Sequence, residues 1–238
     1  MKRSTLALAI VLAAPVLPTV AHADLAFNVG VVTDYRYRGI SQTRVKPTLQ
    51  GGVDFSNGGF YLGAWASGIK WIKDFGGDTS YELDFYGGYK GELAKDVTYD
   101  VGVLTYQYPS NGFSPSANTT EIYGAVTYGA FTAKYSHALT DTFANPDSKN
   151  SYYLDLSAGF DMGGFMVTPH IGYQKISGPV SSVGSYTDYS LTVSKDFSGV
   201  LLSLALVGTD ADKAFYSSPA NGKELGKAGL VLGAKYSF

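Results

Sequence analysis

Charged side chains recur at every second position in one short stretch of this chain. Asp34, Arg36 and Arg38 alternate there with Tyr35 and Tyr37. In a β-strand this spacing puts the charged set on one face and the tyrosines on the other. Two guanidinium groups beside a carboxylate create a local field, which would select ions if that face lined a water-filled passage. The alternative is an internal salt bridge that braces the fold, because an unpaired buried guanidinium is costly.

Carboxylates outnumber basic groups at the other positions that share this face. The acidic positions are Asp54, Glu82, Asp84, Asp100, Glu121, Asp155, Asp161 and Asp188, and the basic ones are Lys90, Lys134 and Lys235. A passage lined by these groups would be acidic on balance and would favour cations. Salt would weaken that preference, since screening acts within about 8–10 Å.

Hydrolytic chemistry has few candidate residues. A serine nucleophile needs a histidine base within hydrogen-bond reach, and only His137 and His170 lie beyond residue 23. His137 follows Ser136, but neighbours in a strand point to opposite faces, so they form no direct dyad. His170 is expected to face the interior and to hydrogen-bond to a neighbour. The chain also lacks Gly-x-Ser-x-Gly, a phosphate-binding loop and a metal-ligand cluster, so we predict no enzyme activity, no cofactor and no metal site.

The first 23 residues are expected to be a cleaved secretory signal peptide. Lys2 and Arg3 precede an apolar run at 6–12, and Ala-His-Ala at 21–23 is a small-x-small cleavage site. The apolar run is too short for a membrane-spanning helix. The domain is then 24–238, with 16 of the 18 basic residues against 20 acidic ones and a formal charge of −4. This balance disfavours a nucleic-acid partner, which would require a basic excess.

The composition narrows the fold class to two options. The chain has no cysteine, 29 Gly, 19 Tyr and 13 Phe, at a mean hydropathy of zero. Beyond the signal, no stretch reaches the ~18 apolar residues of a transmembrane helix. An exported chain of this kind is either a secreted β-sandwich or a membrane β-barrel.

Twelve segments alternate apolar and polar residues with the period of a strand. The segments are 25–38, 47–56, 59–70, 80–92, 96–108, 119–128, 131–139, 151–161, 164–175, 185–196, 199–209 and 224–238. Their connections are alternately short and long, which is typical of a bacterial barrel with short periplasmic turns and long outer loops. We therefore predict a closed antiparallel transmembrane β-barrel of about twelve strands, with both termini periplasmic. Three of the long loops are 71–79, 141–150 and 210–223. Either one of them folds into the barrel and narrows it, or they are solvated surface loops.

The apolar face of each strand is expected to contact lipid and the polar face the lumen. In 81–90, for example, Leu83 and Phe85 share one side while Glu82 and Asp84 share the other, whereas the two faces of 59–70 are not distinguishable. Tyrosines near strand ends predict an interfacial aromatic girdle. Its members are Tyr35, Tyr37, Tyr81, Tyr89, Tyr106, Tyr108, Tyr128, Tyr152, Tyr173 and Tyr236.

Several motifs resemble one known family. The stretch 33–43 reads TDYRYRGISQT and 46–52 reads KPTLQGG, followed later by GFYLGAW at 59–65 and ELDFYGG at 82–88. Together these are similar to the TorF family of porin-type proteins, and the similarity spans essentially the whole of 24–238. The resemblance implies an outer-membrane channel-type barrel and carries no settled substrate. The terminal Phe238 resembles the signal read by the barrel-assembly machinery.

These observations predict a porin-like channel in the outer membrane of a Gram-negative bacterium, for passive diffusion of small hydrophilic solutes or ions. A barrel of twelve strands has a backbone radius of roughly 12 Å, so a water-filled path fits inside it. The expected partners are outer-membrane lipid, the assembly machinery and the solutes. Two alternatives stay open: a non-conducting barrel (an adhesin, a structural protein or a secretion partner) and an outer-membrane hydrolase.

Overall fold

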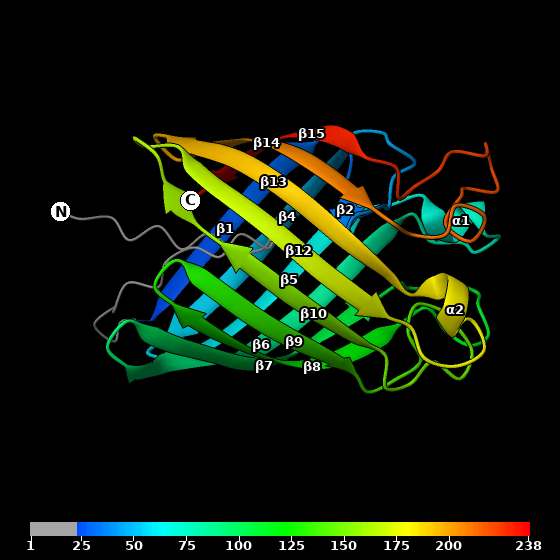
Figure 1. Ribbon diagram of the computed structural model, residues 1–238, viewed down its shortest axis with the longest axis horizontal. Coiled ribbons are helices and arrows are strands. Elements are labelled where there is room, and N and C mark those ends of the chain that lie inside the picture. Colours follow the sequence, from blue (N-terminus) through cyan, green and yellow to red (C-terminus); the bar gives the residue numbers. More distant parts are fainter. Residues whose placement is uncertain (1–22) are drawn as a thin grey trace.

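The structure is a computed structural model that describes residues 23–238, so the expected signal peptide lies outside the described residues except for Ala23. Its wall is a single antiparallel sheet (Figure 1). The wall strands are β1 (Asp24–Val32), β4 (Thr48–Asn57), β5 (Phe60–Gly68), β6 (Tyr81–Ala94), β7 (Val97–Gln107), β8 (Thr119–Tyr128), β9 (Phe131–Ala138), β10 (Tyr152–Ala158), β11 (Phe160–Asp161), β12 (Met166–Lys175), β13 (Tyr186–Phe197), β14 (Val200–Thr209) and β15 (Gly229–Ser237).

The sheet closes on itself. Each strand pairs with the next along the chain, and the last strand β15 pairs with β1, with Val31 opposite Ala234. Strands β10 and β11 both pair with β12 and form one wall strand that is interrupted at Gly159. The predicted closed antiparallel barrel of twelve strands is therefore confirmed. Closure leaves no unpaired sheet edge, which is what a hydrocarbon solvent requires of backbone N–H and C=O groups.

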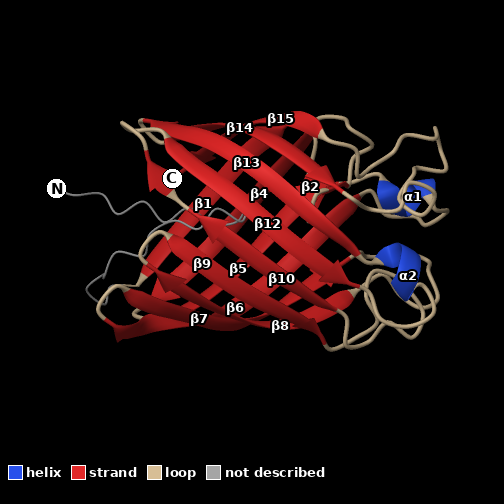
Figure 2. Ribbon diagram, in the orientation of Figure 1, coloured by secondary structure: helices blue, strands red, loops and turns tan. Residues whose placement is uncertain are grey.

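The two ends of the barrel differ (Figure 2). One end carries only short turns, together with the start of β1 and the end of β15, where Phe27 and Phe238 exchange backbone hydrogen bonds of 2.8 and 2.9 Å. We call it the turn end. The other, the loop end, carries the long connections and the short helices α1 (Trp71–Asp74) and α2 (Ser181–Gly184). Within residues 23–238, neither helix is long and apolar enough to cross a membrane.

Burial is inverted relative to a water-soluble protein. On β1 the outward Leu25 and Val29 are 61% and 49% exposed, while Glu82, Glu121 and Asp188 inside the barrel are 1–2% exposed. Large apolar side chains cover the outside because they meet lipid tails, and polar groups collect inside, where they find partners. This inversion excludes the sandwich, whose apolar faces would pack against each other.

Two wall strands are shorter than predicted. β1 ends at Val32 rather than at residue 38, and β15 starts at Gly229 rather than at residue 224. In both places the chain leaves the wall at the loop end. Leu225 instead forms a small buried cluster with Ile40 and Tyr186.

The predicted tyrosine girdle is partly wrong. Tyrosines on the outer surface near strand ends are Tyr81, Tyr89, Tyr128, Tyr152, Tyr173 and Tyr236. Tyr35 and Tyr37 instead point inward, because the chain has already left the wall at Val32. Tyr106 and Tyr108 are also buried, at 4% and 2% exposure, because Tyr106 shares the inner face with Asp84 and Tyr108 packs against Glu82.

Candidate pore lumen

A short hairpin enters the barrel directly after β1. It consists of β2 (Arg36–Tyr37) and β3 (Ile40–Ser41). Its two turn residues Arg38 and Gly39 have φ of 44° and 80°, the positive values that a tight type I′ hairpin turn needs. A Cβ at Gly39 would lie 2.4 Å from the Thr209 side chain on β14. Glycine therefore allows the hairpin tip to approach the inner wall closely.

Arg36 braces the hairpin. Its Nε forms an ion pair with Asp34, which also accepts hydrogen bonds from the hydroxyls of Ser41 and Thr43. Its Nη1 donates to the carbonyl oxygens of Gly39, Leu225 and Lys227 at 2.9–3.1 Å. The guanidinium thereby ties the hairpin to the loop between β14 and β15. This geometry favours the bracing hypothesis over the filter hypothesis for Asp34 and Arg36.

Arg38 reaches two separate strands of the wall from the tip of the hairpin. Its guanidinium donates to Glu121 on β8 at 2.7 Å and to Gln174 on β12 at 2.6 Å. The same group lies over the Tyr153 ring, 4.3 Å from its centroid. Burial lowers the pKa of Arg38, but the Glu121 carboxylate raises it, and the pKa lies well above its usual value. Arg38 is therefore a permanent cation that fixes the hairpin across the lumen.

The tyrosines of the hairpin hold its other side. The Tyr35 hydroxyl donates to Glu82 at 2.7 Å, and its ring packs edge-on against Trp65. The Tyr37 hydroxyl donates to the Tyr106 hydroxyl at 2.9 Å. Burial raises the pKa of Tyr37 well above its usual value, so the hydroxyl stays protonated as a donor. The first long connection, which was not among the three loops considered in the sequence, is thus inserted into the barrel.

Tyrosine hydroxyls satisfy most of the carboxylates inside the barrel. Glu82 accepts from Tyr35 and Tyr108. The other tyrosine–carboxylate pairs are Tyr86 with Asp54, Tyr61 with Asp100, Tyr106 with Glu121 and Tyr153 with Asp188. A neutral donor stabilises a carboxylate while leaving its charge in place. The lumen therefore holds negative charge without a basic residue beside each acid.

Glycines of neighbouring strands make room for these rings. A Cβ at Gly63 would lie 2.2 Å from the Tyr86 ring, its partner in the β5–β6 register. The same arrangement pairs Tyr61 with Gly88 and Tyr123 with Gly102, and the Tyr153 ring covers Gly172, which lies diagonally from it on β12. A tyrosine that covers a glycine lies along the wall instead of crossing the lumen. The aromatic side chains therefore line the barrel without closing it.

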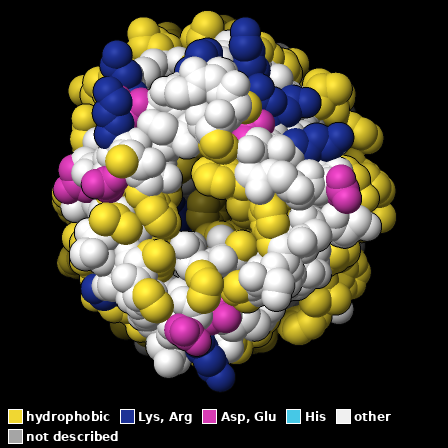
Figure 3. Space-filling view, turned by 90° about the vertical axis from the view of Figure 1, so that its right-hand side faces the viewer, with side chains coloured by type: hydrophobic (Ala, Val, Ile, Leu, Met, Phe, Trp, Pro, Cys, Tyr) yellow, Lys and Arg dark blue, Asp and Glu magenta, His cyan; other side chains and the backbone are white. Residues whose placement is uncertain are grey.

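The barrel encloses a cavity of about 380 Å³. The space-filling view from the loop end shows a hollow that leads into the barrel (Figure 3). Of the residues predicted on the inner face, those that line the cavity are Asp34, Arg36, Arg38, Asp54, Asp84, Lys90, Asp100, Lys134, Asp155 and Asp188. Glu82 and Glu121 are buried beneath the hairpin. Asp161 does not line the cavity: it lies exposed at the turn end, where it accepts the Gly164 N–H.

A family model described as "Bacterial protein of unknown function (Gcw_chp)" matches residues 18–238. The chain belongs to the Gcw_chp family. That description gives no function for this Gcw_chp barrel, and the resemblance to the TorF family stays a prediction. No curated protein sequence matches the chain.

Solved structures resemble the Gcw_chp barrel in fold. A KdgM porin in complex with disordered oligogalacturonate is 8% identical, with a TM-score of 0.55 over 91% of this chain and 99% of that one. LpxR from Salmonella typhimurium is 11% identical, with a TM-score of 0.47 over 90% and 99%. OprD from Pseudomonas aeruginosa is 14% identical, with a TM-score of 0.40 over 90% and 65%. At these identities only the KdgM likeness carries weight, and it shows the fold alone.

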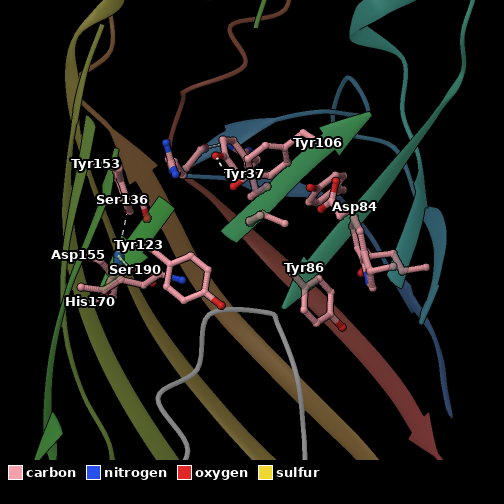
Figure 4. Close-up of a pocket in the computed structure, with 18 of the residues that line it drawn as sticks. Tyr37, Asp84, Tyr86, Tyr106, Tyr123, Ser136, Tyr153, Asp155, His170 and Ser190 are labelled. Carbon is pink, nitrogen blue, oxygen red and sulfur yellow. Dashed lines mark hydrogen bonds and ion pairs between the residues drawn. The ribbon is translucent and has the colours of Figure 1, made fainter. Parts of the chain in front are cut away.

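His170 of the Gcw_chp barrel lies in a polar cluster on the lumen wall (Figure 4). Its Nε2 is 3.1 Å from Asp155 and 3.1 Å from the Tyr153 hydroxyl, and its Nδ1 is 3.6 Å from Asp188. Both ring nitrogens thus face carboxylates or tyrosine. No serine within residues 23–238 hydrogen-bonds to this ring, and no cluster there could hold a metal ion.

Several aromatic residues of the Gcw_chp chain line the cavity. Alternation already places Tyr86 and Tyr153 on the lumen side of their strands, whereas Tyr61, Trp65 and Tyr123 escaped the sequence interpretation. Tyrosine is compatible with lipid, interface and lumen, so its type alone does not assign it to a face. For Tyr61, Trp65 and Tyr123, the signal that would have found them is the glycine at the paired position of a neighbouring strand, which becomes visible only once the register is known. The two faces of β5, indistinguishable in the sequence, are now assigned: Tyr61 and Trp65 point inward and Phe60 and Leu62 outward.

Proposed function

We propose that this protein is an outer-membrane channel for the passive diffusion of small hydrophilic solutes or ions. The observation that carries the proposal is a cavity lined by charged and tyrosine side chains inside a closed barrel whose outer surface is apolar. The hollow at the loop end is the proposed way in for solutes (Figure 3). The β2–β3 hairpin narrows the passage, so the proposal specifies small solutes rather than polymers.

The proposed location follows from the outer surface. An uninterrupted band of apolar side chains around a closed sheet is stable in a bilayer and unfavourable in water. The likeness to a porin fold is consistent with a bacterial outer membrane. We further propose that the turn end, which carries both chain ends, faces the periplasm and that the strand ending in Phe238 contacts the assembly machinery.

The charge of the wall supports a mild preference for cations. Six carboxylates line the cavity, namely Asp34, Asp54, Asp84, Asp100, Asp155 and Asp188, against the four cations Arg36, Arg38, Lys90 and Lys134. Three of the basic groups, Arg38, Lys90 and Lys134, lie over tyrosine rings, at 3.9–5.7 Å from the centroids. The excess of two carboxylates attracts cations and weakens as salt screens it.

The contacts of the lumen histidine do not match those of a serine hydrolase. A serine hydrolase needs a hydroxyl held by the histidine, whereas His170 contacts Asp155, Asp188 and Tyr153. Ser157 and Ser190 are its register neighbours on β10 and β13, but neither hydroxyl is bonded to the ring. Tyr153 and the carboxylates instead hold the imidazole in the wall, which suits a channel lining.

Single-channel recording tests the proposal. Residues 24–238, refolded and inserted into a planar bilayer, should give discrete current steps, and the reversal potential in a salt gradient should show a cation preference. A folded barrel, recognised by heat-dependent gel mobility, that gives no steps would contradict the channel. That result would favour a non-conducting role as an adhesin, a structural protein or a secretion partner.

A further inference from the structure

Asp84 differs from every other carboxylate that lines the cavity. It is 8% exposed, its Oδ1 is buried, and it forms no hydrogen bond or ion pair with any described residue. Each of the other five cavity carboxylates has a tyrosine, histidine, arginine or hydroxyl partner. A buried carboxylate without a partner is unfavourable, so it is stabilised by a proton or by a cation from outside the protein.

The strand register places Asp84 between two aromatic side chains on the inner face. Trp65 is its partner on β5 and Tyr106 its partner on β7. Paired residues of an antiparallel sheet have Cβ atoms about 4.5–5.5 Å apart, so the two rings flank the carboxylate directly. Tyr86 follows two positions later on the same face and also lines the cavity (Figure 4). Aromatic faces attract ammonium and guanidinium groups.

The charges around Asp84 are negative on balance. Glu82 precedes it by two positions on the same face, and Glu121 lies nearby on β8. Arg38 is the cation of this region, and it is already paired with Glu121. Lys90 is six residues farther along β6, a separation of about 20 Å in an extended strand. Of these three carboxyl groups, Glu121 is bonded to the guanidinium and Glu82 to two tyrosines, and the one without a bond, Asp84, lines the cavity.

We infer that Asp84, flanked by Trp65 and Tyr106, is a binding site for a small organic cation inside the lumen. The solute's ammonium or guanidinium group donates hydrogen bonds to the carboxylate, while the aromatic rings contact its charge and its methylene groups. The cavity of about 380 Å³ is within the range of small-molecule sites. This inference rests on the proposed channel function and deepens it by naming a solute class.

Binding is measured on refolded 24–238 in zwitterionic detergent micelles at constant ionic strength. The chain has two tryptophans, so the Trp71→Phe variant leaves Trp65 as the reporter beside the site. The probes are three C4 molecules: putrescine, the neutral 1,4-butanediol and the dianion succinate. Putrescine should change the fluorescence of Trp65 saturably, and the other two should not. An equal response to the diol, or no response to putrescine, would overturn the inference.

Two matched variants locate the site. Asp84→Asn removes the charge with little change in shape and should weaken putrescine binding about tenfold or more, the usual effect of losing a charged hydrogen bond. Asp54→Asn makes the same change at a cavity carboxylate that already holds the Tyr86 hydroxyl, and should leave the affinity within about twofold. Equal loss in both variants would overturn the inference, since it would assign binding to the overall lumen charge. Because binding is read without current, its failure beside intact conductance would leave the channel proposal standing.

Discussion

Charged side chains are stabilised differently in the loop-end half and the turn-end half of the lumen. In the loop-end half, the hairpin packs against the wall, and Glu82 and Glu121 are 1–2% exposed, with direct bonds from Tyr35 and Arg38. In the turn-end half, Asp54 and Lys90 stay partly exposed. Apart from Asp84, the buried carboxylates of the loop end therefore depend on direct bonds, while the partly exposed groups of the turn end can also bind water. Substitutions at the loop end should alter pore width and stability, and those at the turn end mainly ion preference.

The largest effect is expected from removing the hairpin. Replacing residues 34–43 by a short Gly-Ser linker takes Tyr35, Tyr37 and Arg38 out of the lumen, while the wall strands keep their pairing. Single-channel conductance should rise several-fold. Gel mobility verifies that the barrel still closes. An unchanged conductance in a folded barrel would show that the hairpin is not the constriction.

Breaking the ion pair at the hairpin tip should destabilise the protein strongly. Arg38→Ala leaves Glu121 buried without its cation, which costs about 3–5 kcal/mol. The free energy of unfolding, measured by urea titration in lipid vesicles, should fall by that amount. The double variant with Glu121→Gln should recover part of the loss, because no buried charge is then left. Equal stability of the single and double variants would contradict the pairing.

Adding one methyl group beneath a lumen tyrosine should have a moderate effect. In Gly63→Ala the new Cβ meets the Tyr86 ring and pushes it off the wall, away from Asp54. Overpacking of this kind costs about 1–3 kcal/mol, and conductance should decrease. The matched control is Gly124→Ala on β8, where the new Cβ would come no closer than 3.9 Å to a neighbouring atom, and there conductance should not change. Equal conductance of the Gly63 variant and the unmodified barrel would show that the ring does not border the pore.

The smallest effect is expected from the turn-end half. Lys90→Met removes a cation that lies 5.7 Å from the centroid of the Tyr61 ring and keeps a side chain of similar length. The reversal potential should shift modestly towards cations, and more at low salt than at high salt. Stability should change by less than about 1 kcal/mol, as for exposed charges. A loss of stability as large as that of Arg38→Ala would remove the distinction between the halves.

Much of this architecture is readable from the alternation of residue types. The class, the strand number and the lumen-facing side of β6 and β13 follow from a period of two, because a strand in lipid must put its apolar side chains outward. The same rule failed beyond Val32. Residues 34–38 continue the alternation, yet they have left the wall and lead from β1 into the inserted β2–β3 hairpin. Alternation reports which faces differ and contains no information on whether a strand stays in the wall.

The partners of the lumen residues were decided by the tertiary structure. Arg38 meets Glu121 and Gln174, which are 83 and 136 positions away in the chain, and no local pattern encodes such a contact. Tyr86 covers Gly63 because of the β5–β6 register, which is set by the whole barrel. The sequence alone shows that Asp84 is acidic and inward, like its neighbours. Only the folded barrel leaves Asp84 without a partner. Its hydrogen bonds depend on where the neighbouring side chains lie, and their positions are set by the closure and register of the barrel rather than by composition.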